Sequence, residues 1–250
     1  MRSNAATPLG RCNLMTALTA PGPVWLLDEI VANFGAILTE PPDHNPFERK
    51  VRPGWFHCSD LAHKPPRIRF SPRRVVSAYL GLEADKQFDH ETVFAMTIGT
   101  AIDVLLGAAL QHSSLLLGTQ VHYQDADLRL AGTPDLVIDW AGEEVPGDVK
   151  STGRQTFGKF WANDDWCLSN GYFWRQLQAY LLLAHAERGL FIAVNRAGED
   201  YNRDVRQYLA CRWYYRDETA ITTICNDLSY CREWVERYWH GGDLPPETYR

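Results

Sequence analysis

Two short motifs in the middle of the chain combine residue types that can support hydrolytic chemistry. The first is Gly132-Thr-Pro-Asp135 and the second is Asp148-Val-Lys150. Their two carboxylates can hold a hard divalent cation such as Mg²⁺ or Mn²⁺, which prefers oxygen ligands and keeps several waters. An ammonium group beside them can orient a water or stabilise charge on a phosphate. The motifs therefore predict a metal-dependent phosphodiesterase, with Asp135 and Asp148 on the metal and Lys150 as the catalytic lysine.

The residues around these motifs predict a β-hairpin that would bring the two carboxylates together. Strand-like segments cover residues 136–140 and 145–150, and a turn falls at residues 141–144. Because side chains alternate along a strand, Asp148 and Lys150 share one face while Val149 points to the core. The Val149 carbonyl is then the natural additional metal ligand. Pro146 cannot donate to a strand ladder, so we expect a bulge or an edge just before Asp148.

These motifs resemble the core motifs of the PD-(D/E)xK nuclease superfamily. Its fold implies an α/β (α+β) protein with a restriction-endonuclease-like αβββαβ core, in which helices flank a mixed central sheet. Gln176-Leu-Gln-Ala-Tyr180 is similar to the Gln-x-x-x-Tyr motif of the RecB-like and phage-type exonuclease branch. The resemblance implies that Gln176 and Tyr180 bind the substrate, although their spacing fits ordinary core residues of a helix equally well.

A fourth segment of the resemblance lies on the helix before the sheet. Gly99-Thr-Ala-Ile-Asp103 stands where the family usually has Gly-x-x-x-His. Related phage exonucleases carry an acidic residue on this helix, which implies that Asp103 is a further metal ligand. A glycine inside a helix is costly, so Gly99 suggests a close approach of another backbone.

The resemblance implies a Mg²⁺-dependent DNA exonuclease of phage or bacterial recombination and repair, in which a metal-activated water attacks the phosphodiester. It also implies DNA as substrate and either a homo-oligomer or a single-strand annealing partner protein. Three alternatives stay open. They are a structure- or sequence-specific endonuclease of the same fold, a nucleic-acid-binding module without catalysis, and a surface hairpin of an unrelated α/β protein.

The elements that would position these residues follow from hydrophobic periodicity and from proline and glycine positions. The longest helical pattern covers residues 90–117, with Phe94, Ile98, Ile102, Leu105 and Ala109 as its buried stripe. Ser71-Pro72 predicts the start of a helix to about residue 80. Further helices are expected at residues 23–38, 155–161, 172–187 and 218–239, and further strands at residues 120–124, 128–130, 191–194 and 207–213.

Composition is that of one sizeable globular domain. The chain has 250 residues, of which 45% are hydrophobic and 22% charged, and we expect a leader and helix over residues 1–54 and the nuclease domain over residues 55–250. No apolar run is long enough for a membrane span. The six cysteines are scattered, which favours reduced thiols of a cytoplasmic protein and gives no spacing suited to an iron–sulfur cluster. The resemblance implies that this cytoplasm is that of a bacterium or of a phage-infected host. No phosphate-binding loop of ATPases is present.

Charge and aromatic residues offer two further surfaces for nucleic acid. The net charge is −6, but eight Lys or Arg residues and one acid lie between Arg49 and Arg74. This stretch could follow phosphates or form a solvated loop. Aromatic residues between 157 and 174 could stack on bases, although we expect most of them in the core. The histidines lack zinc-ligand spacing and are expected to be structural.

Overall fold

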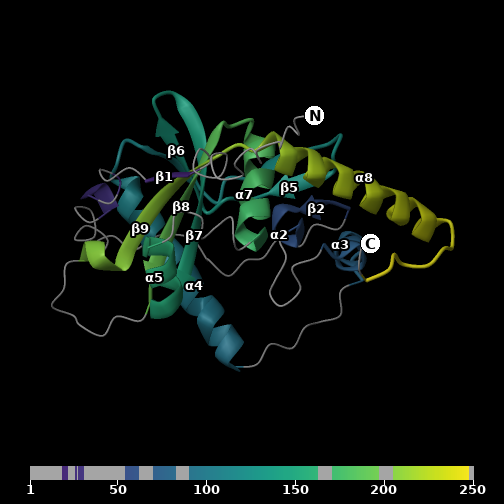
Figure 1. The fold of residues 1–250 in the computed structure, drawn as a ribbon, viewed down its shortest axis with the longest axis horizontal. Coiled ribbons are helices and arrows are strands. Elements are labelled where there is room, and N and C mark those ends of the chain that lie inside the picture. Colours follow the sequence, from purple (N-terminus) through teal and green to yellow (C-terminus); the bar gives the residue numbers. More distant parts are fainter. Residues whose placement is uncertain are drawn as a thin grey trace, which may run out of the picture.

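The computed structural model describes residues 19–21, 26, 28–30, 54–61, 70–82, 90–162, 171–196 and 205–247. Within this part, two sheets and the helices around them make up the fold (Figure 1). The larger sheet has six strands in the order β1-β9-β8-β7-β6-β3. Its strands are β1 (Thr19–Pro21), β3 (Leu116–Thr119), β6 (Leu136–Trp140), β7 (Glu143–Thr152), β8 (Arg188–Asn195) and β9 (Leu209–Tyr215).

The larger sheet is mixed. Its two central strands, β7 and β8, run parallel, whereas their outer neighbours pair antiparallel. The smaller sheet has the order β2-β5-β4, with β2 (Phe56–His57), β4 (Tyr123–Asp125) and β5 (Leu130–Gly132). The chain passes from β5 of the smaller sheet to β6 of the larger one through residues 133–135, so the first motif is the connection between the sheets.

Both faces of the larger sheet are buried, as expected of parallel strands at a sheet centre. Alternate residues of β8 contribute to two separate cores. Phe191 and Ala193 pack in one, whereas Leu190 and Ile192 pack in the other. Helix α7 (Gly171–Ala184) lies between the two sheets, and α8 (Glu218–Trp239) packs against α7 and α3 (Pro72–Tyr79), as Figure 1 shows. The opposite face of the larger sheet is covered by α4 (His90–Gln111).

The predicted core of a restriction-endonuclease-like fold is confirmed in its order and in several boundaries. The strand at residues 136–140 and the helix at residues 218–239 match β6 and α8 at both ends. Ser71 caps α3 and accepts a hydrogen bond from the Arg74 N–H, as the Ser-Pro pair indicates. Two further short helices, α2 (Cys58–Leu61) and α5 (Arg154–Ala162), lie beside the motifs.

Other expectations about the elements are wrong in detail. Helix α4 ends at Gln111 and not near residue 117, because the apolar residues 116–119 form β3 and pair with β6. Leu105 is 42% exposed, and Leu106 takes the buried position beside Ala109. The side chain of Phe94 and most of the helix expected at residues 23–38 lie outside the described residues.

Pro146 lies in a regular ladder, without a bulge. It is opposite Val137 in the antiparallel β6–β7 pairing, and the parallel pairing with β8 begins only at Gly147. The proline therefore occupies a part of β7 that has no β8 partner, which confirms the expected edge. The boundary between a leader and a nuclease domain at residue 54 stays a prediction. No described helix is both long and apolar enough to cross a membrane.

Candidate active site

The two motifs meet where the β6–β7 ladder opens. The last paired residues are Leu136 and Gly147, after which β7 continues beside β8 to Thr152. Asp135 comes directly before β6, and its Oδ2 accepts a hydrogen bond of 2.7 Å from the Val149 N–H. The N–H and C=O of one strand residue point to the same side. The Val149 carbonyl therefore points into the opening that contains Asp135.

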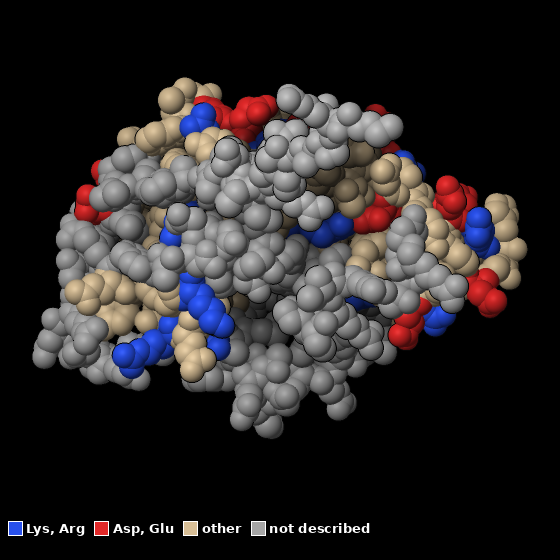
Figure 2. Space-filling view, in the orientation of Figure 1, with Lys and Arg blue, Asp and Glu red and all other residues tan. Residues whose placement is uncertain are grey.

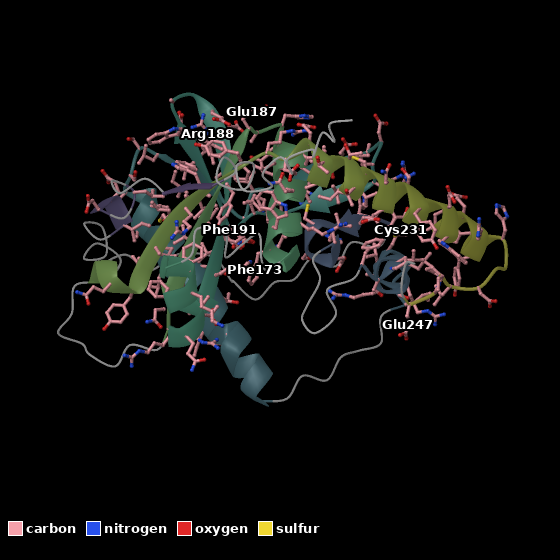
Figure 3. The ribbon with its side chains drawn as sticks, in the orientation of Figure 1. Phe173, Glu187, Arg188, Phe191, Cys231 and Glu247 are labelled. Carbon is pink, nitrogen blue, oxygen red and sulfur yellow. The ribbon has the colours of Figure 1, made fainter. Side chains whose placement is uncertain are left out.

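Asp148 and Lys150 form an ion pair on the face of β7 opposite to the Val149 side chain. Asp148 is 1% exposed, and the Lys150 Nζ lies 2.5 Å from its Oδ2. The pKa of Asp148 is raised to about 7, chiefly by burial and with a smaller contribution from Asp135, while Lys150 opposes the rise. The Lys150 Nζ also lies 5.2 Å from the ring centroid of Phe173. Phe173 comes from α7 and meets Phe191 of β8 edge to face (Figure 3), so a small aromatic wall borders the ammonium group.

Asp103 belongs electrostatically to the same site. Burial raises its pKa to about 8, and repulsion from Asp135 is the next largest cause. Lys150 lowers this pKa and Asp148 raises it slightly, so the α4 carboxylate interacts with all three charged groups of the hairpin. The half-buried acid at this position is therefore near enough to the predicted metal ligands to interact with their charges.

Two glycines of α4, one on either side of Asp103, face the sheet at different distances. A Cβ on Gly99 would lie 3.4 Å from Ser151 Oγ of β7, which is an ordinary van der Waals contact with a side chain and not with another backbone. A Cβ on Gly107 would lie only 2.8 Å from Thr119 Cγ2 of β3. The expected close backbone approach at Gly99 is therefore wrong, and Gly107 is the glycine of α4 at which the packing requires the missing Cβ.

Gln176 and Tyr180 lie on one buried face of α7, next to the first motif. Gln176 Nε2 donates to Tyr180 Oη at 2.8 Å, and the tyrosine hydroxyl donates to the Thr133 carbonyl at 3.3 Å. Burial, followed by the charge of Asp148, raises the pKa of Tyr180 well above its ordinary value, so the hydroxyl keeps its proton. Tyr180 is also part of the core, as the alternative interpretation of the motif expects.

The glycine of the first motif is required by this packing. A Cβ on Gly132 would lie 2.5 Å from Cys58 Sγ and 2.9 Å from Tyr180 Cε1. Real Cβ atoms do not approach other atoms so closely, and neither neighbour can move freely because both are buried. Gly132 therefore allows α2 and α7 to clamp the segment that leads to Asp135.

The donor set suits a hard cation, although its side chains pair with one another as they stand. Among the described residues, no three His, Cys, Asp or Glu side chains are gathered closely enough to hold a metal ion. Asp148 instead pairs with Lys150, and Asp135 accepts the Val149 N–H. Burial and mutual repulsion raise the pKa of Asp103 to about 8 and that of Asp148 to about 7, so one lysine does not keep the three acids fully ionised. Oxygen ligands whose ionised form needs further positive charge suit Mg²⁺ or Mn²⁺.

One contact to the site was missed by sequence reasoning. Gln120, just after β3, donates its backbone N–H to the Asp135 carbonyl at 3.1 Å and its Nε2 to Asp135 Oδ1 at 3.3 Å. No motif indicates this residue, because its place depends on the register between β3 and β6. That register includes an irregularity between Leu116 and Gly118, which the sequence does not specify.

The other predicted nucleic-acid surfaces are only partly visible. Phe157, Phe160 and Trp174 are buried, which confirms the core interpretation for these aromatic residues. In the basic stretch, Arg73 donates to the Pro245 carbonyl and Arg74 lies 3.8 Å from Asp60, so both hold elements together. Residues 49–53 and 62–69 of that stretch lie outside the described part of the chain.

Comparisons with known proteins support the architecture. No family model matches the sequence, and no curated protein is significantly similar to it. A phage-related exonuclease from Haemophilus somnus 129PT has a similar structure, with a TM-score of 0.52, 13% identity, and coverage of 75% of this chain and 96% of that one. LHK-Exo in complex with dAMP gives a TM-score of 0.50 at 14% identity, covering 75% and 91% of the two chains. LHK-Exo is an alkaline exonuclease from Laribacter hongkongensis.

At these identities the likeness concerns the fold. The shared part covers three quarters of this chain and nearly the whole of each exonuclease chain. The chain has the restriction-endonuclease-like fold of these phage-type exonucleases, as its motifs predict.

Proposed function

We propose that this protein is a Mg²⁺-dependent DNA nuclease, with Mn²⁺ as an alternative ion. One observation carries the proposal above all others. Asp135, Val149 and the Asp148–Lys150 pair converge where the β6–β7 ladder opens, in a fold that solved exonucleases share. Random surface charges do not explain a 1%-exposed carboxylate beside two other acids. Buried charges at this cost are typical of functional sites.

The carboxylates of Asp135 and Asp148 and the carbonyl of Val149 would hold the metal, with Asp103 as a further ligand. The bound metal would polarise the scissile phosphate and lower the pKa of a water bound beside it. Lys150 would orient the attacking water or stabilise the charge that builds on the phosphate oxygens. Asp148 would keep the ammonium group of Lys150 at the centre of the site, and Phe173 would border it on the α7 side.

Gln176 and Tyr180 would act on the substrate strand mainly through the segment that they hold. Both are buried, and Gln176 donates a hydrogen bond to Tyr180, whose hydroxyl donates to the Thr133 carbonyl. They would fix the segment that carries Asp135. The DNA strand would then be positioned against that segment. Lys and Arg side chains near α5 would follow the phosphate backbone. Figure 2 shows basic side chains gathered in this region, and the exposed Arg154 and Lys159 belong to α5, which begins shortly after Lys150.

Exonuclease activity is the finer part of the proposal, in phage or bacterial recombination or repair. The two solved structures with TM-scores of 0.50 and 0.52 are exonucleases, which supports it. A homo-oligomer or an annealing partner protein would follow from the same resemblance. We expect the protein to act in the cytoplasm of a bacterium or of a phage-infected cell.

A cleavage assay on two DNA forms tests the proposal. End-labelled linear duplex and closed circular DNA would be incubated with the protein and either Mg²⁺ or EDTA. We expect loss of linear DNA with Mg²⁺ and survival of the circles. Cutting of the circles would favour the endonuclease alternative. DNA binding without cleavage in the presence of Mg²⁺ would favour a binding module, and would contradict the proposed chemistry.

A further inference from the structure

Gln120 contacts Asp135 at two points. Its backbone N–H donates to the Asp135 carbonyl at 3.1 Å, and its side-chain Nε2 donates to Asp135 Oδ1 at 3.3 Å. The neighbouring pair in the β3–β6 ladder is Thr119 with Leu136, so the contact continues the pairing by one step. The two hydrogen bonds tie both the main chain and the carboxylate of Asp135 to the end of β3.

The backbone of Gln120 is strained in a way that such a contact explains. Its φ is +51°, in the left-handed region that glycine and asparagine adopt more readily than glutamine. A residue held there costs about 1 kcal/mol or more, and such strain persists only where the surroundings impose it. A glycine would relieve the strain but would lack the side-chain amide that donates to the Asp135 carboxylate. An asparagine would tolerate the backbone, but its side chain is one methylene shorter.

The Asp135 carboxylate is thus oriented from two sides. Val149 N–H donates to Oδ2 from β7, and Gln120 Nε2 donates to Oδ1 from β3. An ionised carboxylate has about four lone-pair positions, so these two bonds leave positions for a cation. Residues that orient a metal ligand in this way typically change metal affinity by about 10–100-fold when removed.

We propose that Gln120 is a positioning residue, which orients the Asp135 carboxylate for a divalent cation. This inference rests on the proposed function, because it assigns Gln120 to the same metal site. The amide does not touch the reacting phosphate. Its loss widens the range of carboxylate orientations, and the cation then binds more weakly.

The test uses the full chain in two Gln120 variants, Gln120→Gly and Gln120→Asn, which both keep the backbone N–H. The control is Ala141→Gly at the tip of the β6–β7 hairpin, because Ala141 has a similar φ of +55° and no part in the site. Mn²⁺ binding is measured by electron paramagnetic resonance without DNA, and thermal unfolding is measured in EDTA. The Mg²⁺ concentration for half-maximal DNA cleavage provides a third reading.

We expect both Gln120 variants to bind Mn²⁺ about tenfold more weakly, the lower end of the range for such residues. Gln120→Gly should unfold at the same or a higher temperature than the wild type, because the strain is relieved. Ala141→Gly should also keep or gain thermal stability, but with unchanged Mn²⁺ affinity. Cleavage by the Gln120 variants should recover at high Mg²⁺, which a mere loss of folded protein would not allow.

The possible results distinguish a failure of the Gln120 proposal from a failure of the proposed nuclease function. Wild-type Mn²⁺ affinity in Gln120→Gly would overturn the positioning role and leave the proposed nuclease intact. Weaker binding that goes with an equal loss of thermal stability in both variants would also overturn it, since the residue would then be merely structural. A wild-type protein that binds no Mn²⁺ would overturn both proposals together.

Discussion

The candidate site has two parts that hold their carboxylates by different means. The hairpin arm, formed by β6 and β7, carries Asp135, Asp148 and Lys150, each fixed by a direct hydrogen bond or ion pair. The helix arm, formed by α4, carries Asp103, whose position depends on how closely the helix packs on the sheet. In the hairpin arm, hydrogen bonds and the ion pair allow the carboxylates little displacement. In the helix arm, the position of Asp103 depends on small residues that let α4 pack closely on the sheet.

This difference is visible in the electrostatics. For Asp148, burial raises the pKa and the attraction of Lys150 is the second largest influence. For Asp103, burial also raises the pKa, but repulsion from Asp135 comes second. The hairpin arm thus compensates its buried charge from within, whereas the Asp103 carboxyl of the helix arm keeps its proton up to about pH 8 unless an external cation favours its ionised form. Four variants probe this contrast.

The largest effect is expected from Lys150→Met in the hairpin arm. Removal of one partner leaves the buried Asp148 carboxylate uncompensated, which costs about 3 kcal/mol when that carboxylate is ionised. Urea unfolding of the metal-free protein should show this loss at pH 8.5, and much less of it at pH 5, where Asp148 is protonated in both proteins. DNA cleavage should be lost at either pH.

The double variant Asp148→Asn/Lys150→Met is the control. It should recover most of the stability at pH 8.5, because no buried charge remains, but it should not recover cleavage. An equal loss of stability in Lys150→Met at both pH values would mean that the ion pair does not compensate Asp148.

The next effect concerns the segment that leads to Asp135. Gly132→Ala inserts a Cβ against Cys58 Sγ and Tyr180 Cε1 and should cost about 2 kcal/mol through overpacking. Thermal unfolding should show a fall of about 4–8 °C for a chain of this size. Gly158→Ala is the matched control, because nothing lies within 4 Å of its Cβ position in α5. That variant should keep or gain stability, and equal behaviour of the two would contradict the clamp.

Asp103→Asn tests the helix arm through pH. The folded pKa of Asp103, about 8, lies above its ordinary value of 3.8. The stability that its protonated form contributes is therefore complete below about pH 4 and is lost as the pH rises through 8. The metal-free variant should be more stable than the wild type at pH 9, by about 2–4 °C if the difference is about 1 kcal/mol. If the variant is less stable than the wild type at pH 9, the ionised Asp103 carboxylate does not destabilise the metal-free protein, which contradicts the prediction.

The smallest effect is expected where α4 meets β3. Gly107→Ala inserts a Cβ at 2.8 Å from Thr119 Cγ2, and the flexible methyl group should limit the cost to about 1 kcal/mol. The second-site change Thr119→Ser deletes that methyl group. If the close contact is what matters, Thr119→Ser should restore the thermal stability of Gly107→Ala. Additive losses in the double variant would show that the helix arm is held in some other way.

The two arms also differ in how far their residues could be predicted from the sequence. Asp135, Asp148 and Lys150 were found together because a hairpin is a local structure, with alternation and a short turn written in consecutive residues. Val149 is buried as alternation predicts, and its N–H contact with Asp135 follows from the same pairing. Local patterns were enough for this arm.

Long-range contacts were not accessible in the same way. Leu116 and Leu117 fit a helix as well as a strand, and only pairing with β6 decides between these states. The place of Gln120 beside Asp135 depends on that pairing. Gly107 gives no signal in sequence beyond its cost inside a helix, because the partner that requires it, Thr119, lies on another element. Geometry between elements is set by packing, which single residues do not specify.

The most direct test of the account is the Mg²⁺ dependence of DNA cleavage by the wild type and by Asp148→Asn. The substrate is end-labelled linear duplex DNA at pH 8.5, and the initial rate is followed as Mg²⁺ is added to metal-free protein. We expect the wild type to go from no cleavage to a saturating rate, and Asp148→Asn to stay at background throughout while it remains folded. Cleavage by wild type in EDTA, or by folded Asp148→Asn at the wild-type rate, would contradict the metal site between β6 and β7.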